Sequence, residues 1–549
     1  MKQLVFYIFW GYCSFFCVHI HAQDGLQDKQ LVVEKNRVLE LSKANRLQNR
    51  MQKIELPPVT TEQVYELQKT SLVLPSLQIN TSPFILPNPK IAVEKLPMNF
   101  IKGGFGNYTT LLGEAFLQAP THDKYVLSLS ANHLSSATGT ILDEKSSANR
   151  TTITGQGAYK VTATTEIFGQ VGYFRRGVNY YGYAPIVLKD WDTEKIKQTY
   201  TTLDFLVGYR ANPTTKVTYQ TELNYYNFST KTGESENAFA VKGTTTRSLS
   251  DKGTLAIGLD ASFASISTNT KQSGRNLLVV NPLYTLVFEK VSLTMGGTIV
   301  YDTDTLKETN ALRLYPHLQL TYVGTKKMKL YACITGTTQR TSFRRFALEN
   351  PFIGNQLAFT HTNKQWELTA GSEGRIAQLL GYHVKTSYAH YKNLYFFNNS
   401  LADSAKFAVL YDTEGTKLFS AMAEVYTQLQ AIKLSLKSEL FSYSTSTLTK
   451  AWHKPTFTTT VTCRYLYDSK LIVEAELFNQ NGLEGYNFLQ KKAYTLPAIF
   501  DTNVQVNYLF TPNISAFLKL NNIFSQQYQQ YLYYTTQQFN VVAGAMWKF

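Results

Sequence analysis

The chain has 549 residues, of which 44% are hydrophobic and 13% are aromatic, including 36 Tyr and 33 Phe. The mean hydropathy of −0.21 excludes a bundle of membrane helices, but it fits a barrel whose strands alternate lipid-facing and lumen-facing residues. The net charge of +15 is spread along the chain without a dense basic tract or a nucleic-acid-binding motif. We therefore expect no nucleic-acid partner and assign the basic residues to a barrel lumen or to contacts with anionic lipid.

Residues 1–22 are predicted to be a cleaved signal peptide. Lys2 precedes an apolar run from Leu4 to Ile20, and Ala22 is a small residue at a suitable cleavage position. The run is too short to be read first as a membrane-spanning helix, and an uncleaved anchor is the alternative. Cys17 lacks the residues that usually precede a lipidated cysteine, so we expect no lipid modification there. Cleavage leaves a mature chain with a net charge of +14.

Residues 23–98 are predicted to be a mostly irregular segment that lies in the periplasm or threads the lumen. The segment begins polar, with a short helix expected around residues 38–52, and seven prolines punctuate it from residue 57 onward. Its 76 residues are marginal for an independent hydrophobic core. Our hypothesis is that residues 56–98 thread into the lumen of the following domain, or that a separate protein fills that lumen.

Residues 99–549 are predicted to form an antiparallel transmembrane β-barrel of about 20–22 strands. Residues 471–477, 504–510 and 516–520 alternate in polarity, as strands do when one face meets lipid and the other meets the lumen. We count 21 strands, but a single-chain barrel with both ends in the periplasm requires an even number. A large soluble β-sandwich is the alternative, although strands of this length would be unusual in one.

The predicted connections alternate in length, with short periplasmic turns and long outer loops. Short turns are expected near residues 119–123, 163–165, 212–215, 289–290, 324–327, 378–381, 469–470 and 511–513. Long loops are expected near residues 137–148, 184–194, 268–276, 347–361, 443–455, 479–496 and 528–538.

Residues 539–549 are predicted to be the last strand. Every second residue from Phe539 to Phe549 is apolar, which gives the strand one apolar face and one mixed face. A soluble protein seldom ends on such a strand, because its uncovered face and edge would promote aggregation. We assign Trp547 and Phe549 as the barrel-assembly signal, and we expect the outer-membrane assembly machinery and outer-membrane lipid to be partners.

Several short motifs resemble TonB-dependent-receptor-like outer-membrane barrels of the Bacteroidetes type. Residues 101–108 (IKGGFGNY) match the opening of such barrels, residues 521–524 (NNIF) with Gln527 and Tyr528 match a run two strands before their end, and the terminal WKF also fits. Lys35-Asn36-Arg37 and Ala44-Asn45-Arg46 resemble the preceding segment of the family. The resemblance covers most of residues 30–549.

The resemblance implies a receptor or transport barrel in the cell outer membrane for the uptake or surface binding of a bulky nutrient. It also implies a partner such as TonB, or a periplasmic or surface protein. Full receptors of the family carry a plug domain of well over a hundred residues, which the segment 23–98 is too short to match. A partner-plugged porin and a structural or secretion-associated barrel are therefore the alternatives.

The candidate ligand contacts are two arginine pairs and the tyrosines near them. Arg175-Arg176 and Arg344-Arg345 each lie beside aromatic residues, an arrangement that suits contacts with anions or carbohydrates at the barrel mouth. Snorkelling arginines of an interfacial girdle are the alternative, and we also assign Trp452 and Trp547 to that girdle. The full set of candidate contacts is Arg175, Arg176, Tyr180, Tyr181, Arg344, Arg345 and Tyr533.

No enzymatic or metal site is expected. A lipid hydrolase is the alternative: His133 and Ser135 share one strand face and could pair as base and nucleophile, as in some outer-membrane phospholipases, but no third orienting residue is evident. The histidines lack metal-ligand spacing, and no glycine loop has the strand–helix context that a bound phosphate needs. We expect no catalytic residue and no cofactor, and we interpret Cys333 and Cys463 as two unrelated strand residues.

Overall fold

The computed structural model describes residues 99–549 except 121, 184, 212–216, 269–271, 305–308, 326–327, 356, 377–378 and 430. The predictions of a signal peptide and of a lumen-threading segment lie outside the described residues.

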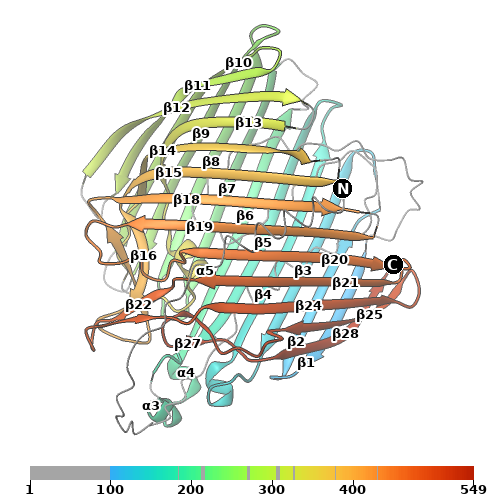
Figure 1. The fold of residues 1–549 in the computed structure, drawn as a ribbon, viewed down its shortest axis with the longest axis vertical. Helices are drawn as coiled ribbons and strands as arrows, with labels where there is room; N and C mark the ends of the chain where they lie inside the picture. Colours follow the sequence, from blue (N-terminus) through green and yellow to red (C-terminus); the bar gives the residue numbers. More distant parts are fainter. Residues whose placement is uncertain are drawn as a thin grey trace, which may run out of the picture. The chain divides into compact units, whose positions relative to one another are not determined.

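Within the described residues, 22 strands form one closed antiparallel sheet (Figure 1). Each strand pairs with its neighbour along the chain, and the first strand pairs with the last. This result confirms the predicted barrel and replaces the count of 21 by an even number. The strands are β1 (Phe100–Gly106), β2 (Thr110–Gln118), β3 (Tyr125–Ser136), β4 (Ala148–Lys160), β5 (Thr165–Asn179), β6 (Lys197–Ala211), β7 (Val217–Thr230), β8 (Ser235–Ser248), β9 (Gly253–Ser267), β10 (Gln272–Val287), β11 (Val291–Asp304), β12 (Thr309–Thr325), β13 (Met328–Gln339), β14 (Thr362–Ile376), β15 (Leu380–Lys392), β18 (Thr416–Gln428), β19 (Ile432–Ser444), β20 (Phe457–Tyr467), β21 (Leu471–Asn481), β24 (Ile499–Leu509), β25 (Ile514–Asn521) and β28 (Asn540–Lys548).

Both ends of the barrel domain lie at the end with short turns, and the long loops lie at the other end. The connection 393–415 is a long loop that we did not predict, and the predicted long loop at 268–276 is short because β10 begins at Gln272. Among the described residues, the long-loop end carries three small hairpins and four short helices. These are β16 (Leu394–Asn399) with β17 (Phe407–Asp412), β22 (Glu484–Asn487) with β23 (Lys492–Thr495), β26 (Gln529–Tyr531) with β27 (Tyr534–Thr535), η1 (Asp143–Ser146), α3 (Pro185–Lys189), α4 (Thr193–Ile196) and α5 (Phe343–Glu349).

In the described part of the chain, no helix is long and apolar enough to cross a membrane.

The two faces of the strands differ in polarity as the alternation predicts. On β6, Leu203, Phe205 and Val207 point outward and are 41–56% exposed. The lumen side carries ion pairs between adjacent strands, such as Lys329 with Glu373 at 2.9 Å. An apolar outer wall around a charged lumen is the arrangement of a membrane barrel, since a water-soluble barrel would reverse it.

The seam between β1 and β28 closes the sheet with unusually close backbone contact. Gly104 lies opposite Gly544, and the Phe517 ring covers both on the lumen side. Lys102 Nζ lies 4.5 Å from the centroid of this ring and belongs to an ion cluster that reaches across the seam. Glu114 on β2 accepts Lys102 Nζ at 3.0 Å and Lys519 Nζ of β25 at 3.3 Å.

Asn107 ties the seam at the long-loop end. Its backbone N–H donates to the Val541 carbonyl at 3.1 Å, and its Nδ2 donates to the Phe539 carbonyl at 2.8 Å. Its Oδ1 accepts the Val541 N–H at 2.9 Å and the Asn540 amide at 3.0 Å. One side chain and its backbone thus join the β1–β2 turn to the last strand by four hydrogen bonds.

The NNIF motif at residues 521–524 has a structural role in this fold. Asn522 adopts φ 50°, a left-handed conformation that asparagine tolerates better than most residues. Its amide donates to the Gln526 and Gln537 carbonyls at 3.0 and 2.7 Å, and its N–H donates to Asn503 Oδ1 at 3.1 Å. The motif therefore organises the loop between β25 and β28.

Candidate functional site at the barrel mouth

The loops at the long-loop end pack together around a core of aromatic residues. We call loops 137–147, 180–196, 340–361, 393–415, 445–456, 482–498 and 522–539 the cap. The largest buried cluster of the described residues joins several cap loops to the upper ends of β6 and β7, and it includes Tyr181, Phe346, Phe407 and Tyr534. Because these rings contact each other, the cap is a packed assembly and its loops do not act as separate arms.

Loop 340–361, between β13 and β14, lies at the centre of the cap (Figure 1). It contains α5, which begins where Ser342 Oγ accepts the Arg345 N–H at 3.0 Å. Phe343 and Phe346 of this helix are buried, and Phe343 packs on Phe228 of β7 at 5.2 Å between ring centroids. Phe346 packs on Tyr395 of the β16–β17 hairpin at 4.9 Å. The helix thus joins the barrel wall to other cap loops.

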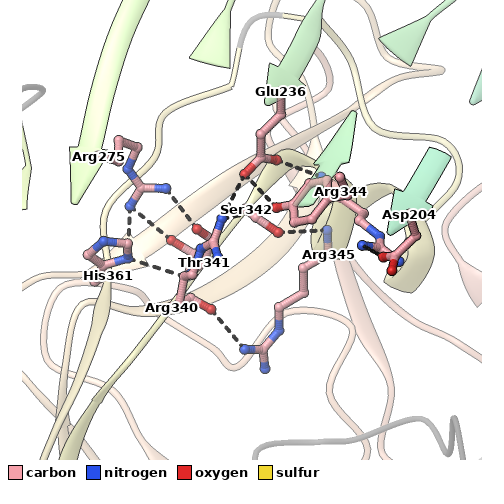
Figure 2. Close-up of polar contacts among 10 residues, drawn as sticks. Asp204, Glu236, Arg275, Arg340, Thr341, Ser342, Arg344, Arg345 and His361 are labelled. Atoms are coloured by element: carbon pink, nitrogen blue, oxygen red, sulfur yellow. Dashed lines mark hydrogen bonds and ion pairs between the residues drawn. The ribbon is translucent and has the colours of Figure 1, made fainter. Parts of the chain in front are cut away.

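Ion pairs fix α5 to the lumen side of the wall (Figure 2). Arg344 Nη1 lies 2.7 Å from Asp204 Oδ2 on β6, and Arg340 Nη2 lies 3.6 Å from Glu236 Oε1 on β8. The Arg344 N–H also donates to Glu236 Oε2 at 3.1 Å. Asp204 lies in the middle of β6, so loop 340–361 folds inward into the mouth.

A second polar cluster holds the start of loop 340–361 against β10 (Figure 2). Arg275 Nη1 donates to the Thr341 carbonyl at 2.8 Å, and its Nη2 lies 3.0 Å from His361 Nδ1. The His361 ring is neutral here, because burial and the nearby Arg275 hold its pKa well below the usual value. A neutral ring nitrogen can accept the guanidinium hydrogen bond, which a protonated ring could not.

Glu349, at the end of α5, forms the polar centre of the cap. Its Oε1 lies 2.8 Å from Lys454 Nζ, and its Oε2 accepts the Tyr395 hydroxyl at 2.5 Å. Burial disfavours the carboxylate, but Lys454 and Tyr395 outweigh burial and hold the pKa of Glu349 below its usual value. The Tyr531 hydroxyl donates to the Glu349 carbonyl at 2.9 Å, so four cap loops meet at this residue.

His453 connects three cap loops through its two ring nitrogens. Nδ1 lies 2.8 Å from the Phe397 carbonyl, and Nε2 accepts the Leu532 N–H at 3.1 Å. Burial, together with the nearby Lys454, lowers the pKa of His453 to about 4. The neutral ring fits both partners as a donor at Nδ1 and an acceptor at Nε2.

We expect the cap to loosen in acid because of His453. Its pKa of about 4 in the folded protein lies below the ordinary histidine value of 6.5, so its contribution is complete above pH 6.5 and is lost as the pH falls through 4. The full loss is about 3 kcal/mol by proton linkage. Hydrogen exchange at the Leu532 amide, corrected for intrinsic rates, should show falling protection over this range. In His453→Gln the same amide should lose this pH dependence, and equal pH profiles in both proteins would contradict the prediction.

The structure brings most of the predicted contact residues to the cap. Arg176 donates to the Leu348 carbonyl at 3.3 Å, and Arg345 donates to the Arg340 carbonyl at 3.1 Å. Tyr180 and Tyr181 are buried in the core of the cap, where their hydroxyls donate to the carbonyls of Ile353 and Thr535.

Tyr533 and Arg175 lie apart from this group. The Tyr533 hydroxyl accepts the Asn487 amide at 2.5 Å beside a smaller apolar cluster. Arg175 points outward from β5 and is exposed. Contact of the seven residues with a ligand stays a prediction.

Trp452 is not a girdle residue, contrary to our expectation. It is 5% exposed and packs on Tyr486 in the cap, at 5.6 Å between ring centroids. Trp547 is 54% exposed on the outer wall beside Phe549, with 4.6 Å between the ring centroids, as a girdle residue would be. The error arose because the sequence around Trp452 gives no sign that the loop folds onto the β22–β23 hairpin.

Sequence reasoning missed the partners of the arginines, namely Asp204, Glu236, Arg275, Arg340 and His361. Each is a polar residue in or next to a strand. The alternation of the strand already places such a residue on the lumen side, so nothing in the sequence marks it as part of a site. The one available signal was the spacing of Arg340 and Arg344, which stand four residues apart around the α5 start.

His133 and Ser135 lie within hydrogen-bonding distance, with 3.2 Å between Nε2 and Oγ. His133 Nδ1 lies 2.8 Å from the Thr151 hydroxyl, a neutral group that lacks the charge of an orienting carboxylate. Cys333 and Cys463 are free, and no cluster of three metal-binding side chains occurs in the described ranges. The absence of an enzymatic site stays a prediction.

Comparison with known proteins gives matches in structure alone. No family model matches the sequence, and no curated protein matches it. The siderophore receptor PirA from Acinetobacter baumannii matches with a TM-score of 0.65 and 10% identity, over 84% of this chain and 81% of that one. The FrpB iron transporter from Neisseria meningitidis (F3-3 variant) matches with a TM-score of 0.63 and 10% identity, over 83% and 82%.

The ferripyoverdine receptor of the outer membrane of Pseudomonas aeruginosa matches with a TM-score of 0.61 and 12% identity, over 84% and 72%. This chain shares its fold with these three proteins. At these identities the likeness concerns the fold alone.

Proposed function

We propose that this chain is an outer-membrane receptor barrel for the uptake or surface binding of a bulky nutrient. The observation that carries the proposal is the 22-strand barrel whose mouth is occupied by a packed cap. A barrel of this size encloses a wide lumen that must be plugged if the membrane is to stay sealed. A cap held by ion pairs to the lumen wall is suited to gated entry.

The arginines of loop 340–361 give the mouth a cationic character. Arg340, Arg344 and Arg345 lie within six residues, and the two wall carboxylates that pair with them are Asp204 and Glu236. Arg345 donates to a backbone carbonyl. Such a surface favours a ligand that carries negative charge or many oxygen acceptors.

Ferric siderophores are the first ligands to test, because similar folds occur in siderophore receptors. We expect one complex of a panel to quench the fluorescence of the purified protein through the cap residues Trp191 and Trp452, and Arg345→Gln to weaken its binding by about tenfold. Arg247→Gln, at the short-turn end of β8, is the matched control. If no complex binds and the protein conducts ions steadily, a porin replaces the receptor.

A partner-plugged porin is the second candidate, because 22 strands leave a lumen that something must fill. Deleting residues 23–98 and recording single-channel conductance separates the sources of the plug. A rise in conductance would support occlusion by this segment. No change in conductance would assign occlusion to the cap or to another protein. Purification from native membranes would then show whether TonB or another periplasmic or surface partner stays bound.

A further inference from the structure

The outer wall of β3 to β6 carries a groove below a row of polar side chains. These four strands are consecutive neighbours in the sheet (Figure 1). The register aligns His133, Thr151, Arg175 and Thr201 in one row, one residue from each strand. All four belong to the outward face, the same face as the exposed Leu129, Val171 and Phe205. Between the polar row and the groove the outward positions of these strands are apolar, whereas polar residues such as Ser135 and Asn149 continue on the long-loop side of the row.

The groove lies on the same face, further toward the short-turn end. It has a volume of about 700 Å³. Leu129, Val171 and Phe205 line it, and Gly155, Gly157 and Gly169 form its floor, because they place no side chain on the wall. Two rows of residues line the groove. The first row contains Leu129, Gly155 and Val171, and it lies four residues from the polar row along each strand, toward the short-turn end. At about 3.3 Å a residue, the groove begins about 13 Å below the polar row and its second row is about 20 Å below it.

The charge of the polar row identifies the kind of headgroup. Arg175 is exposed, and no ion pair to its guanidinium occurs among the described residues. No outward-facing position of β3 to β6 is a carboxylate, so no acidic group on this wall competes for the cation. The hydroxyl of Thr151 is next to Arg175 in the row, and Ser135 and His133 complete a hydrogen-bonded network with it. A guanidinium beside hydroxyl and imidazole groups is suited to a phosphate.

We propose that the outer wall of β3 to β6 binds one phosphate-bearing acyl lipid, with its headgroup at Arg175 and an acyl chain in the groove. The separation of about 13–20 Å between the two features matches one lipid that lies along the strands. This inference rests on the proposed outer-membrane location, since the wall must meet lipid. It does not depend on the ligand of the mouth.

Two substitutions test the two parts of the site. Arg175→Gln removes the charge, and Gly155→Leu fills the groove. A Cβ at residue 155 would meet only Leu129 Cδ1, at 3.9 Å, so the fold should accept the new side chain. Gly243→Leu is the matched control on β8, since its Cβ would meet Leu259 Cβ at the same 3.9 Å. Arg247→Gln, an outward arginine of β8, is the control for the charge.

Native mass spectrometry of the purified protein in a neutral detergent measures the binding of dipalmitoyl phosphatidic acid. We expect one bound molecule for the wild-type protein, binding weakened about tenfold by each test substitution, and wild-type binding for both controls. Dipalmitoyl phosphatidylcholine should bind more weakly, because its choline cancels the charge. The proposal is overturned if the test variants bind as the wild type does, or if inorganic phosphate displaces the lipid.

A different occupant would also overturn it. If the protein dimerises in detergent and Gly155→Leu abolishes the dimer, the groove holds a second copy of the chain. Failure of the lipid site can be told apart from failure of the proposed function. A protein that stayed monomeric and dissolved without detergent would refute the membrane location itself, whereas the results above concern only the groove.

Discussion

Gly544→Val should prevent closure of the barrel. A Cβ at residue 544 would overlap the Gly103 carbonyl oxygen and would lie 2.6 Å from Gly104 Cα. Both are backbone atoms of the opposite strand, so relief requires that β1 and β28 separate. We expect a destabilisation of more than about 4 kcal/mol, the range of exceptional substitutions. Folded barrel can be separated from unfolded chain by its mobility in detergent gels before and after heating, and the folded fraction should almost vanish.

Gly103→Val is the control for this substitution. Gly103 lies on the opposite strand of the same seam, but on the outward face, and a Cβ there would meet no atom within 4 Å. Valine also favours strands, so this variant should fold like the wild type. If both variants fold equally well, the seam tolerates more separation than its register indicates.

Lys454→Met should destabilise the cap more than the double variant that removes both charges of the Lys454–Glu349 ion pair. The substitution leaves the Glu349 carboxylate without its ion-pair partner. Because the Glu349 side chain is only 16% exposed, water cannot fully replace that partner. Removing one partner of a buried pair typically costs 3–5 kcal/mol, and we expect about 3 kcal/mol because Tyr395 still donates to Glu349. The double variant Lys454→Met/Glu349→Gln removes the charge as well and should recover most of the loss.

Hydrogen exchange at the Asn350 amide, which donates to the Phe346 carbonyl at 2.8 Å, reports this local stability. Lys450→Met is the matched control, because Lys450 is 56% exposed and pairs with Glu484 at 3.4 Å near the surface. We expect a change of less than about 1 kcal/mol there. Equal exchange in the single and the double variant would show that the charge of Glu349 does not destabilise the cap.

The barrel could be predicted from the sequence because its strands carry a repeating signal. Each lumen-facing residue is followed by a wall residue, so runs such as 471–477 identify both a strand and its two faces. Even the terminal strand follows this rule, with Trp547 on the outer wall and Met546 inside. The register across strands follows from short turns once the faces are known.

The cap could not be predicted because its loops have no period. Trp452 was assigned to the girdle on residue type alone, whereas its place is decided by Tyr486, a residue of another loop. Likewise, Tyr180 is buried because its hydroxyl meets the Ile353 carbonyl, 173 residues away. Contacts between loops depend on how each loop folds across the mouth toward loops far away in the sequence, and single-sequence patterns do not encode that arrangement.

The pairing of β1 with β28 has a consequence for biogenesis. Asn107 and Val541 are 434 residues apart, so the sheet keeps two unsatisfied edges until synthesis of the polypeptide is almost complete. Contacts of such sequence separation form late and slowly. A truncated product that ends before Asn540 would offer both edges to any other extended chain, so this topology favours an escort that covers the two edges until the seam closes.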